Sequence, residues 1–321
     1  MAYSVPTTRS DGYVVDAAEW NKNTVDNPIA LKALIDAISS GWAYPCDGRI
    51  TLTSGTPVTS TDVTAATTLY FTPFRGSQIA LYSGSAWAIF TLTELSLAVP
   101  ATTNTMYDLF VYSNSGTPTL EATAWTNDTT RATALTTQNG VYVKSGSTTR
   151  RYVGSFRTTG VSGQTEDSAA KRLVYNAQNR VARPMRVQDT TNTWAYSTAT
   201  FRQANNSAAN QLAVVQGLAE DAISVQVQGY VYNSASGVNA FVSIGQDSTS
   251  AKGADVISTG APAPALNVAT QIQAYLNTTP AVGYHYYAWL EYDATGGGTT
   301  TWVGDNGGSL VQTGITGMWR S

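Results

Sequence analysis

Cysteine and histidine are almost missing from this sequence: its 321 residues include one cysteine, Cys46, and one histidine, His285. A single cysteine forms no intrachain disulfide, so packing and hydrogen bonds must hold the fold together, and the cysteine usage fits assembly in a reducing cytoplasm. Metal sites built from several histidines and cysteines are excluded on the same ground. We therefore expect no metal and no cofactor.

Any nucleophilic site of the Ser-His-Asp or Cys-His kind would have to use His285. The histidine lies in a strand-like segment, residues 284–292, that carries bulky side chains on both faces. Such a strand is typical of an internal position, which favours a packed histidine over a catalytic one.

Charge is scarce as well. Charged residues make up 12% of the chain and the formal net charge is −3, where a typical soluble domain carries about 25% charged residues. The few lysines are scattered, so no basic patch predicts nucleic-acid binding. A surface covered by hydroxyls and amides has little charge repulsion, which favours a protein packed against copies of itself or other partners.

Long apolar runs are missing too. No segment approaches the roughly 20 apolar residues of a membrane span, and the first residues lack a basic stretch followed by an apolar one. We expect neither membrane insertion nor classical secretion. Release by lysis inside a virus particle is one remaining route out of a cell.

The first 47 residues carry two helix signals. Asp16 with Glu19 resembles a capping box, and Asn27 followed by Pro28 repeats a helix start. The second helix places four apolar residues on one stripe, and Trp20 precedes it. These helices cannot form a core alone, so we interpret residues 1–47 as an anchor that assembles through Trp20, Leu31, Leu34, Ile35 and Ile38.

Beyond Cys46 the pattern changes to short alternating segments separated by Gly, Ser, Asn and Pro, which is typical of antiparallel β-structure. We predict a first β-domain over residues 48–160 and a second over residues 184–321. Between them, Ala169, Leu173, Ala177 and Val181 recur at four-residue steps, which predicts a linker helix within residues 161–183. The expected fold is mainly β: a helical anchor, then two antiparallel β-sandwich or barrel-like domains joined by a helix.

Parts of the sequence resemble a known group. The opening D-G-Y-V-V-D-A-A-E-W-N-K-N-T-V-D-N, the run from Gly48 to Tyr82, and the segments W-T-N-D-T-T-R-A-T and T-T-R-R-Y-V-G-S-F resemble tailed-bacteriophage minor structural and fibre-like virion proteins. The resemblance covers about the first half of the chain. It implies a role in the virion, assembled in the bacterial host cytoplasm, and it brings no catalytic residues.

Adjacent carboxylates occur at Glu166–Asp167 and Glu220–Asp221, and glycan-cleaving enzymes commonly use two acids. Both pairs lie at predicted helix or strand ends, so capping and turn roles are the favoured interpretation. We expect no catalytic residues, which leaves a polysaccharide hydrolase as the weakest alternative.

Aromatic side chains beside loops could stack on sugar rings, although most large aromatics of β-sandwiches are core. The candidates for binding loops in the C-terminal half are Trp194, Trp302, Asp305, Asn306 and Trp319. Asp305 to Gly308 reads more simply as a hairpin turn.

The sequence thus predicts a virion structural protein, a tail or head-tail fibre or spike-type subunit docked through residues 1–47 and contributing to host attachment. We expect other virion proteins as partners, a homo-oligomer and a host-surface glycan as ligand. A head decoration or collar protein and a host-glycan adhesin are the alternatives.

Overall fold

The computed structural model describes residues 28, 29, 31, 44–262, 267–294, 297–308 and 311–321. The chain divides into two compact units, Met1–Cys46 and Asp47–Ser321. In the first unit, Pro28, Ile29 and Leu31 have helical backbone, and the helical anchor over residues 1–47 stays a prediction. The other predicted anchor residues lie outside the described part.

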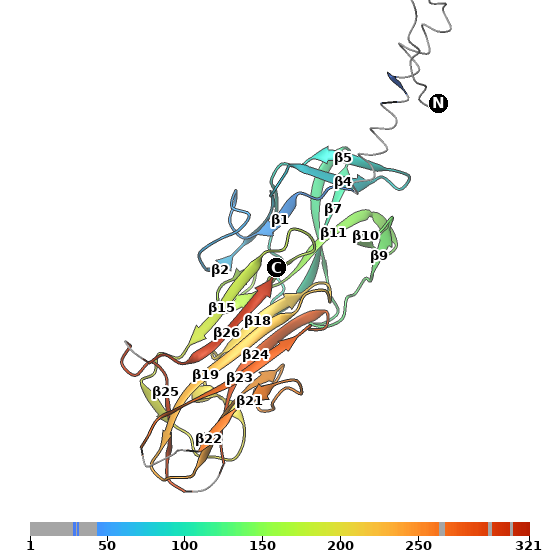
Figure 1. Ribbon diagram of the computed structural model, residues 1–321. Helices are drawn as coiled ribbons and strands as arrows, with labels where there is room; N and C mark the ends of the chain where they lie inside the picture. Colours follow the sequence, from blue (N-terminus) through green and yellow to red (C-terminus); the bar gives the residue numbers. More distant parts are fainter. Residues whose placement is uncertain (1–27, 30, 32–43, 263–266, 295–296, 309–310) are drawn as a thin grey trace, which may run out of the picture. The chain divides into compact units, whose positions relative to one another are not determined.

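The second unit is mainly β, as predicted, and its strands form several sheets that are almost entirely antiparallel (Figure 1). A three-stranded sheet has the order β1-β3-β6, and β4 pairs with β5 in a hairpin. The bounds of these strands are β1 Gly48–Thr51, β3 Thr68–Pro73, β4 Gln78–Tyr82, β5 Trp87–Thr91 and β6 Leu95–Ala98.

A six-stranded sheet has the order β8-β7-β11-β10-β9, with β14 paired to β11. Its strands are β7 Met106–Asn114, β8 Thr117–Ala124, β9 Leu135–Gln138, β10 Val141–Lys144, β11 Ser147–Arg157 and β14 Val174–Asn176. The turn sequences S-G-S at Ser83 to Ser85 and K-S-G-S at Lys144 to Ser147 are typical of hairpin connections, and they join β4 to β5 and β10 to β11.

An eight-stranded sheet has the order β2-β12-β13-β18-β24-β20-β22, with β17 paired to β24. Its strands are β2 Val63–Ala66, β12 Thr165–Asp167, β13 Lys171–Arg172, β17 Arg202–Gln203, β18 Gln211–Gln216, β20 Asn239–Gln246, β22 Gly260–Pro262 and β24 Gly283–Asp293. β13 and β18 run parallel. The short 3-10 helix η2, Ala204–Asn206, follows β17.

A seven-stranded sheet has the order β15-β26-β19-β23-β21, and β25 links β16 to β19. Its strands are β15 Ala182–Gln188, β16 Thr193–Ala195, β19 Ile223–Asn233, β21 Ile257–Ser258, β23 Thr270–Thr278, β25 Thr300–Val303 and β26 Gly314–Arg320. The segment 248–266 is rich in Ser, Gly, Ala and Pro, which is typical of a loop, yet it contains β21 of this sheet and β22 of the eight-stranded sheet.

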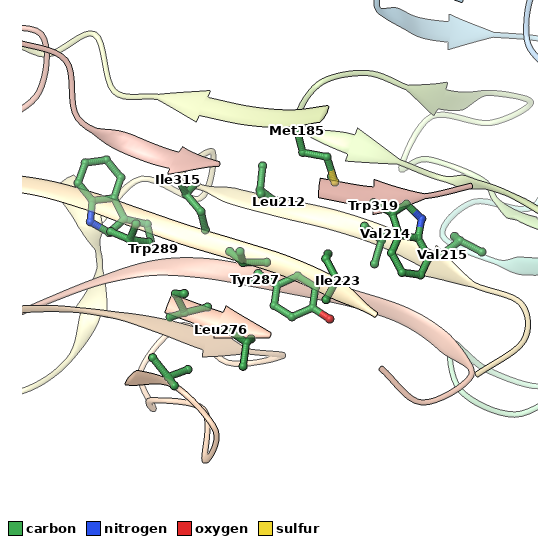
Figure 2. Packing of buried hydrophobic residues seen from close by; sticks show 14 of the residues in the cluster. Met185, Leu212, Val214, Val215, Ile223, Leu276, Tyr287, Trp289, Ile315 and Trp319 are labelled. Atoms are coloured by element: carbon green, nitrogen blue, oxygen red, sulfur yellow. The ribbon is translucent and has the colours of Figure 1, made fainter. Parts of the chain in front are cut away.

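The seven- and eight-stranded sheets pack face to face, because β23 contacts β20 and β26 contacts β18. Buried and outward residues alternate along β19, where valines and glutamines alternate in the sequence V-Q-V-Q. Figure 2 shows part of the shared core, in which Ile223, Leu276 and Ile315 come from one sheet and Leu212, Tyr287 and Trp289 from the other.

The predicted linker helix is wrong. Residues 161–183 contain β12, β13 and β14 instead. Residues 172–177 are buried without a break, and their backbone bonds distant strands: Arg157 N–H donates to the Leu173 carbonyl and Ala177 N–H to the Val153 carbonyl. A segment buried on both faces and paired to other strands overrides the weak helical preference that four-residue spacing indicates.

The eight-stranded sheet contains strands from both sides of that segment: β2 lies in the first predicted β-domain and β18 to β24 lie in the second. By contrast, the seven-stranded sheet is built wholly from residues beyond 181. The division into β-domains at residues 160 and 184 stays a prediction.

Candidate functional site

The outer face of the seven-stranded sheet carries amide side chains in register. Arg186 of β15 pairs with Thr316 of β26, which pairs with Gln226 of β19. In the next row Gln188 and Gln228 flank Gly314. Because residues in register lie on the same face of a sheet, these side chains point together to the outside. β15, β26 and β19 are seen side by side in Figure 1.

Gly314 opens a depression of about 150 Å³ in this face. It has no side chain to fill the space between Gln188 and Gln228, and a Cβ built on it would lie 2.3 Å from the Val187 carbonyl oxygen. Neighbouring strands lie about 4.8 Å apart, so one missing side chain leaves a gap about 10 Å wide between the flanking residues. The polar and charged side chains that line this depression and are not buried are Arg186, Gln188, Gln226, Gln228, Gln312 and Thr316, and we call this set the amide face.

Several polar groups of the amide face are free to bind a ligand. Within the described residues, the side chains of Arg186, Gln226 and Gln228 have no hydrogen-bond partner. Gln188 is tied to its neighbour instead, since its Nε2 donates to Oε1 of Gln312 over 2.6 Å. That bond leaves the amide oxygen of Gln188 and the amide nitrogen of Gln312 available. The sheet therefore holds several donors and acceptors toward solvent on a rigid base.

The electrostatics of the amide face are simple. Arg186 is its one charged side chain, and no carboxylate is among the six residues. Tyr275 follows Gln226 in the same row and is 38% exposed. The arrangement offers a cation, planar amides and a neighbouring aromatic ring, which are groups that can contact a hydroxylated ligand.

Two of the predicted binding-loop tryptophans are core residues. Trp302 is 1% exposed and Trp319 is 0% exposed, so the expectation that they are surface anchors is wrong. Both lie in strands, on the face of the seven-stranded sheet opposite the amide face, and β-strand alternation turns them inward. The Trp302 indole N–H donates to the Tyr196 carbonyl over 3.1 Å.

Trp194 is partly buried and takes part in a polar cluster. Its indole N–H donates to Oε2 of Glu291 over 2.6 Å, and Arg202 Nε donates to Oε1 over 2.7 Å. Burial raises the pKa of Glu291, and these donors offset part of that effect. Glu291 is 0% exposed, which separates it from any bulky substrate. The cluster instead supports the packing of Trp194 against Trp289, whose ring centre lies 5.9 Å away.

Asp305 and Asn306 form the predicted turn between β25 and β26. The Gly308 N–H donates to the Asp305 carbonyl over 2.9 Å, and Asn306 has a φ of 48°. Gly307 N–H also donates to Asn192 Oδ1 over 2.9 Å, which ties the turn to a neighbouring loop. The residues form a turn, but it is not a hairpin connection, because β25 and β26 each pair with β19 and not with one another. A binding role for this loop stays a prediction.

Of the predicted anchor residues, Leu31 is described and is 47% exposed. Trp20, Leu34, Ile35 and Ile38 lie outside the described residues. The assembly role of this set stays a prediction.

The carboxylate pairs are placed in ion pairs. Asp167 is bound by both Arg172 and Arg183, at 2.9 and 3.0 Å, rather than capping a helix, because β12 replaces the helix there. Glu220 lies in a turn, Asp221 directly follows it, and both contact Arg180. His285 is buried, as the sequence indicated, and Cys46 is partly buried.

Among the described residues, no three His, Cys, Asp or Glu side chains gather as a metal site, and no helix is long and apolar enough to cross a membrane. The amide face itself was missed from the sequence. The sequence shows that the glutamines of V-Q-V-Q lie on one side of a strand. Their place beside Arg186 depends on the register of three strands, and the sequence of one strand does not determine that register.

No protein-family model matches the chain, and no curated protein matches its sequence. Among solved structures, the insecticidal delta-endotoxin Cry8Ea1 of Bacillus thuringiensis aligns over 85% of this chain with 7% identity and a TM-score of 0.23. The alignment spans 51% of the toxin chain. A structure of infectious bursal disease virus, Gx strain, aligns over 86% of this chain and 74% of its own, with 11% identity and a TM-score of 0.20. Likenesses this weak carry no argument about fold or function.

Proposed function

We propose that this chain is a structural subunit of a bacteriophage particle, in a tail or head-tail fibre or spike-type appendage, and that its β-sheets contribute to host attachment. Residues 1–47 dock to other virion proteins in this proposal, and the chain acts as a homo-oligomer without catalytic activity. The virion assignment is supported by the phage-like segments and by the low charge fraction of 12%.

One observation carries the attachment role: the amide face presents unpartnered hydrogen-bonding groups beside a depression on a rigid sheet. Buried polar groups need partners, but exposed ones in register form a surface that selects a ligand by its hydroxyl and charged groups. A purely architectural subunit, such as a head decoration or collar protein, has no need of this depression.

The finer architecture belongs to the same proposal. We take residues 48–160 and 184–321 as two sandwich-type domains, each with sheets of its own. Its support is that the six-stranded sheet draws five of its strands, β7 to β11, from the first range, and that the seven-stranded sheet draws all of its strands from residues 182–320. The joining element is the strand segment β12 to β14 in place of a helix.

The test has two arms. Immunogold labelling of purified particles should place this chain at one type of site on the virion, and the purified chain should reduce phage adsorption to host cells in proportion to its concentration. Particles purified to constant composition that lack the chain would contradict the virion role. Particles that contain it, with adsorption unchanged by a saturating excess of the free chain, would contradict the attachment role and favour the collar or decoration alternative.

A further inference from the structure

Arg186 is unlike the other arginines that the structure describes. Each of those has a hydrogen bond, an ion pair or an aromatic ring within reach. The guanidinium of Arg186 has none of these, although it lines the depression beside Gly314. An arginine carries donors and no acceptor, so its complement is an acceptor-only group, and a carboxylate fits its planar fork in a bidentate way.

The glutamine side chains beside Arg186 complement a different chemical group on the ligand. Each glutamine side chain offers one acceptor oxygen and one donor nitrogen, which match a hydroxyl that both donates and accepts. Gln226 and Gln228 are free to do this, and Gln312 keeps its amide nitrogen. A ligand that fits the whole amide face therefore combines several hydroxyls with one anionic group.

Size and charge narrow the ligand class. The gap at Gly314 is about two strand spacings wide, which admits a single sugar ring between Gln188 and Gln228. Tyr275 stands in the adjacent row, next to Gln226, where its ring can cover an apolar sugar face. A nucleic acid needs several phosphate contacts, and one cation does not supply them.

We infer that the amide face binds an acidic saccharide, with a uronate-type carboxylate on Arg186 and ring hydroxyls on Gln226 and Gln228. This inference rests on the proposed attachment function for the source of the ligand, a host-surface polysaccharide. The binding step itself needs only the purified chain.

The experiment titrates the full chain with three probes, and saturation-transfer NMR and calorimetry measure the binding. The probes are trigalacturonate, its carboxyl-reduced neutral counterpart and a short polyglycerol phosphate. Three variants are compared: Arg186→Gln removes the cation, Gln228→Ala removes one amide, and Arg75→Gln removes an exposed arginine from the loop after β3 as a matched control.

Trigalacturonate should bind the wild type and the Arg75→Gln chain equally. Arg186→Gln should weaken it by about tenfold or more, as loss of a charged hydrogen bond predicts. Gln228→Ala should weaken the acidic and the neutral probe by similar factors. These exposed side chains leave the unfolding temperature unchanged, so a loss of binding is not a loss of fold.

Equal binding of the neutral probe, or indifference to Arg186→Gln, would overturn the inference, and so would binding of polyglycerol phosphate alone. Absence of binding by all three probes at millimolar concentration would overturn it as well. The proposed function fails by other readouts, namely absence from the particle and no competition for adsorption, so the two failures are distinguishable.

Discussion

The buried His285 contacts the exposed Asp247, and the histidine faces an acceptor on each side. Nδ1 of His285 lies 2.7 Å from Oδ2 of Asp247, and Nε2 lies 2.9 Å from the Ala281 carbonyl oxygen. Neither oxygen can donate, so both bonds form only when both ring nitrogens carry protons. The second carboxylate oxygen of Asp247 accepts the Tyr286 N–H over 2.9 Å. This geometry therefore favours the protonated imidazole over the neutral one.

This geometry predicts a pH dependence of stability. Burial lowers the pKa of His285, but the hydrogen bond and the charge of Asp247, with the Ala281 carbonyl, outweigh it, and the net pKa is raised above its ordinary value. A raised folded-state pKa adds stability that is fully present below the unfolded pKa of about 6.5 and is lost as pH rises through the folded pKa. His285→Asn should be destabilised relative to the wild type by more at pH 6 than at pH 8 in urea unfolding.

Asp247→Asn serves as the partner variant, because it keeps the histidine and removes its counter-charge. It should flatten the same pH dependence. Since the chain has one histidine, a difference between wild type and His285→Asn that is equal at both pH values would show that the histidine is neutral in the folded state.

The ion pairs of Asp167 predict that its substitution lowers the free energy of unfolding by more than the substitution of His285. Its carboxylate contacts Arg172 at 2.9 Å and Arg183 at 3.0 Å, and both arginines are 5% exposed. Burial, with the charge of Arg183, lowers the pKa of neighbouring Arg49 to about 10. Asp167→Asn would remove the carboxylate that Arg172 and Arg183 share, leaving Arg183 only the more distant charge of Asp62. Breaking a buried pair costs about 3–5 kcal/mol.

The control for Asp167 is Glu220, whose side chain is 41% exposed in its pair with Arg180. Glu220→Gln should change the free energy of unfolding by about 1 kcal/mol or less, as surface ion pairs do. Urea unfolding of both variants measures the contrast. Similar small losses would show that the arginines of the Asp167 cluster are hydrated in solution.

Part of this architecture could be predicted from the sequence. The alternation along β19 indicates which of its faces is buried, and the turn from Ser83 to Ser85 indicates a hairpin. Both features depend only on residues that are neighbours in the chain. The segment around Leu173 could not, since its partners in β11 lie about twenty residues away and decide strand over helix. Trp302 and Trp319 point inward because side chains alternate along their strands, β25 and β26. The sequence places both tryptophans next to loop residues, so it does not show that they lie within strands.

The amide face shows the same division. The sequence indicates that Gln226 and Gln228 share one side of a strand, but Gly314 and Arg186 join them only through the pairing of β26 with β15 and β19. Register across strands of distant sequence position depends on the whole core, so no local signal specifies it.

Gly154 of β11 predicts an effect of crowding. A Cβ at this position would lie 2.1 Å from the Tyr175 carbonyl oxygen and 2.5 Å from Cδ1 of Ile50. The first contact is with backbone of the paired strand β14, which cannot turn away as a side chain can. Gly154→Ala should therefore lower the free energy of unfolding by about 1–3 kcal/mol or more.

Gly160→Ala is the matched control for this change, because the nearest atom to its Cβ would be 3.7 Å away, on the exposed side chain of Asn104. Thermal unfolding of the two variants should separate them clearly. Equal unfolding temperatures would mean that β14 shifts away from β11 at little cost.

The last prediction concerns the junction between the two compact units. Asp47 belongs to the β-sheet unit: its N–H donates to the Gln78 carbonyl over 2.9 Å, and its Oδ2 accepts the Gln78 N–H over 2.8 Å. A deletion that ends at Cys46 keeps these bonds, whereas a deletion through Asp47 removes them. We expect residues 47–321 to stay folded, with an unfolding temperature close to that of the full chain, since their core is built within that range.

If residues 1–46 dock the subunit, the shortened chain should retain trigalacturonate binding and be missing from assembled particles. A shortened chain that enters particles at normal occupancy would move the docking surface into the β-sheets, and one that fails to fold would show that the first unit completes their core.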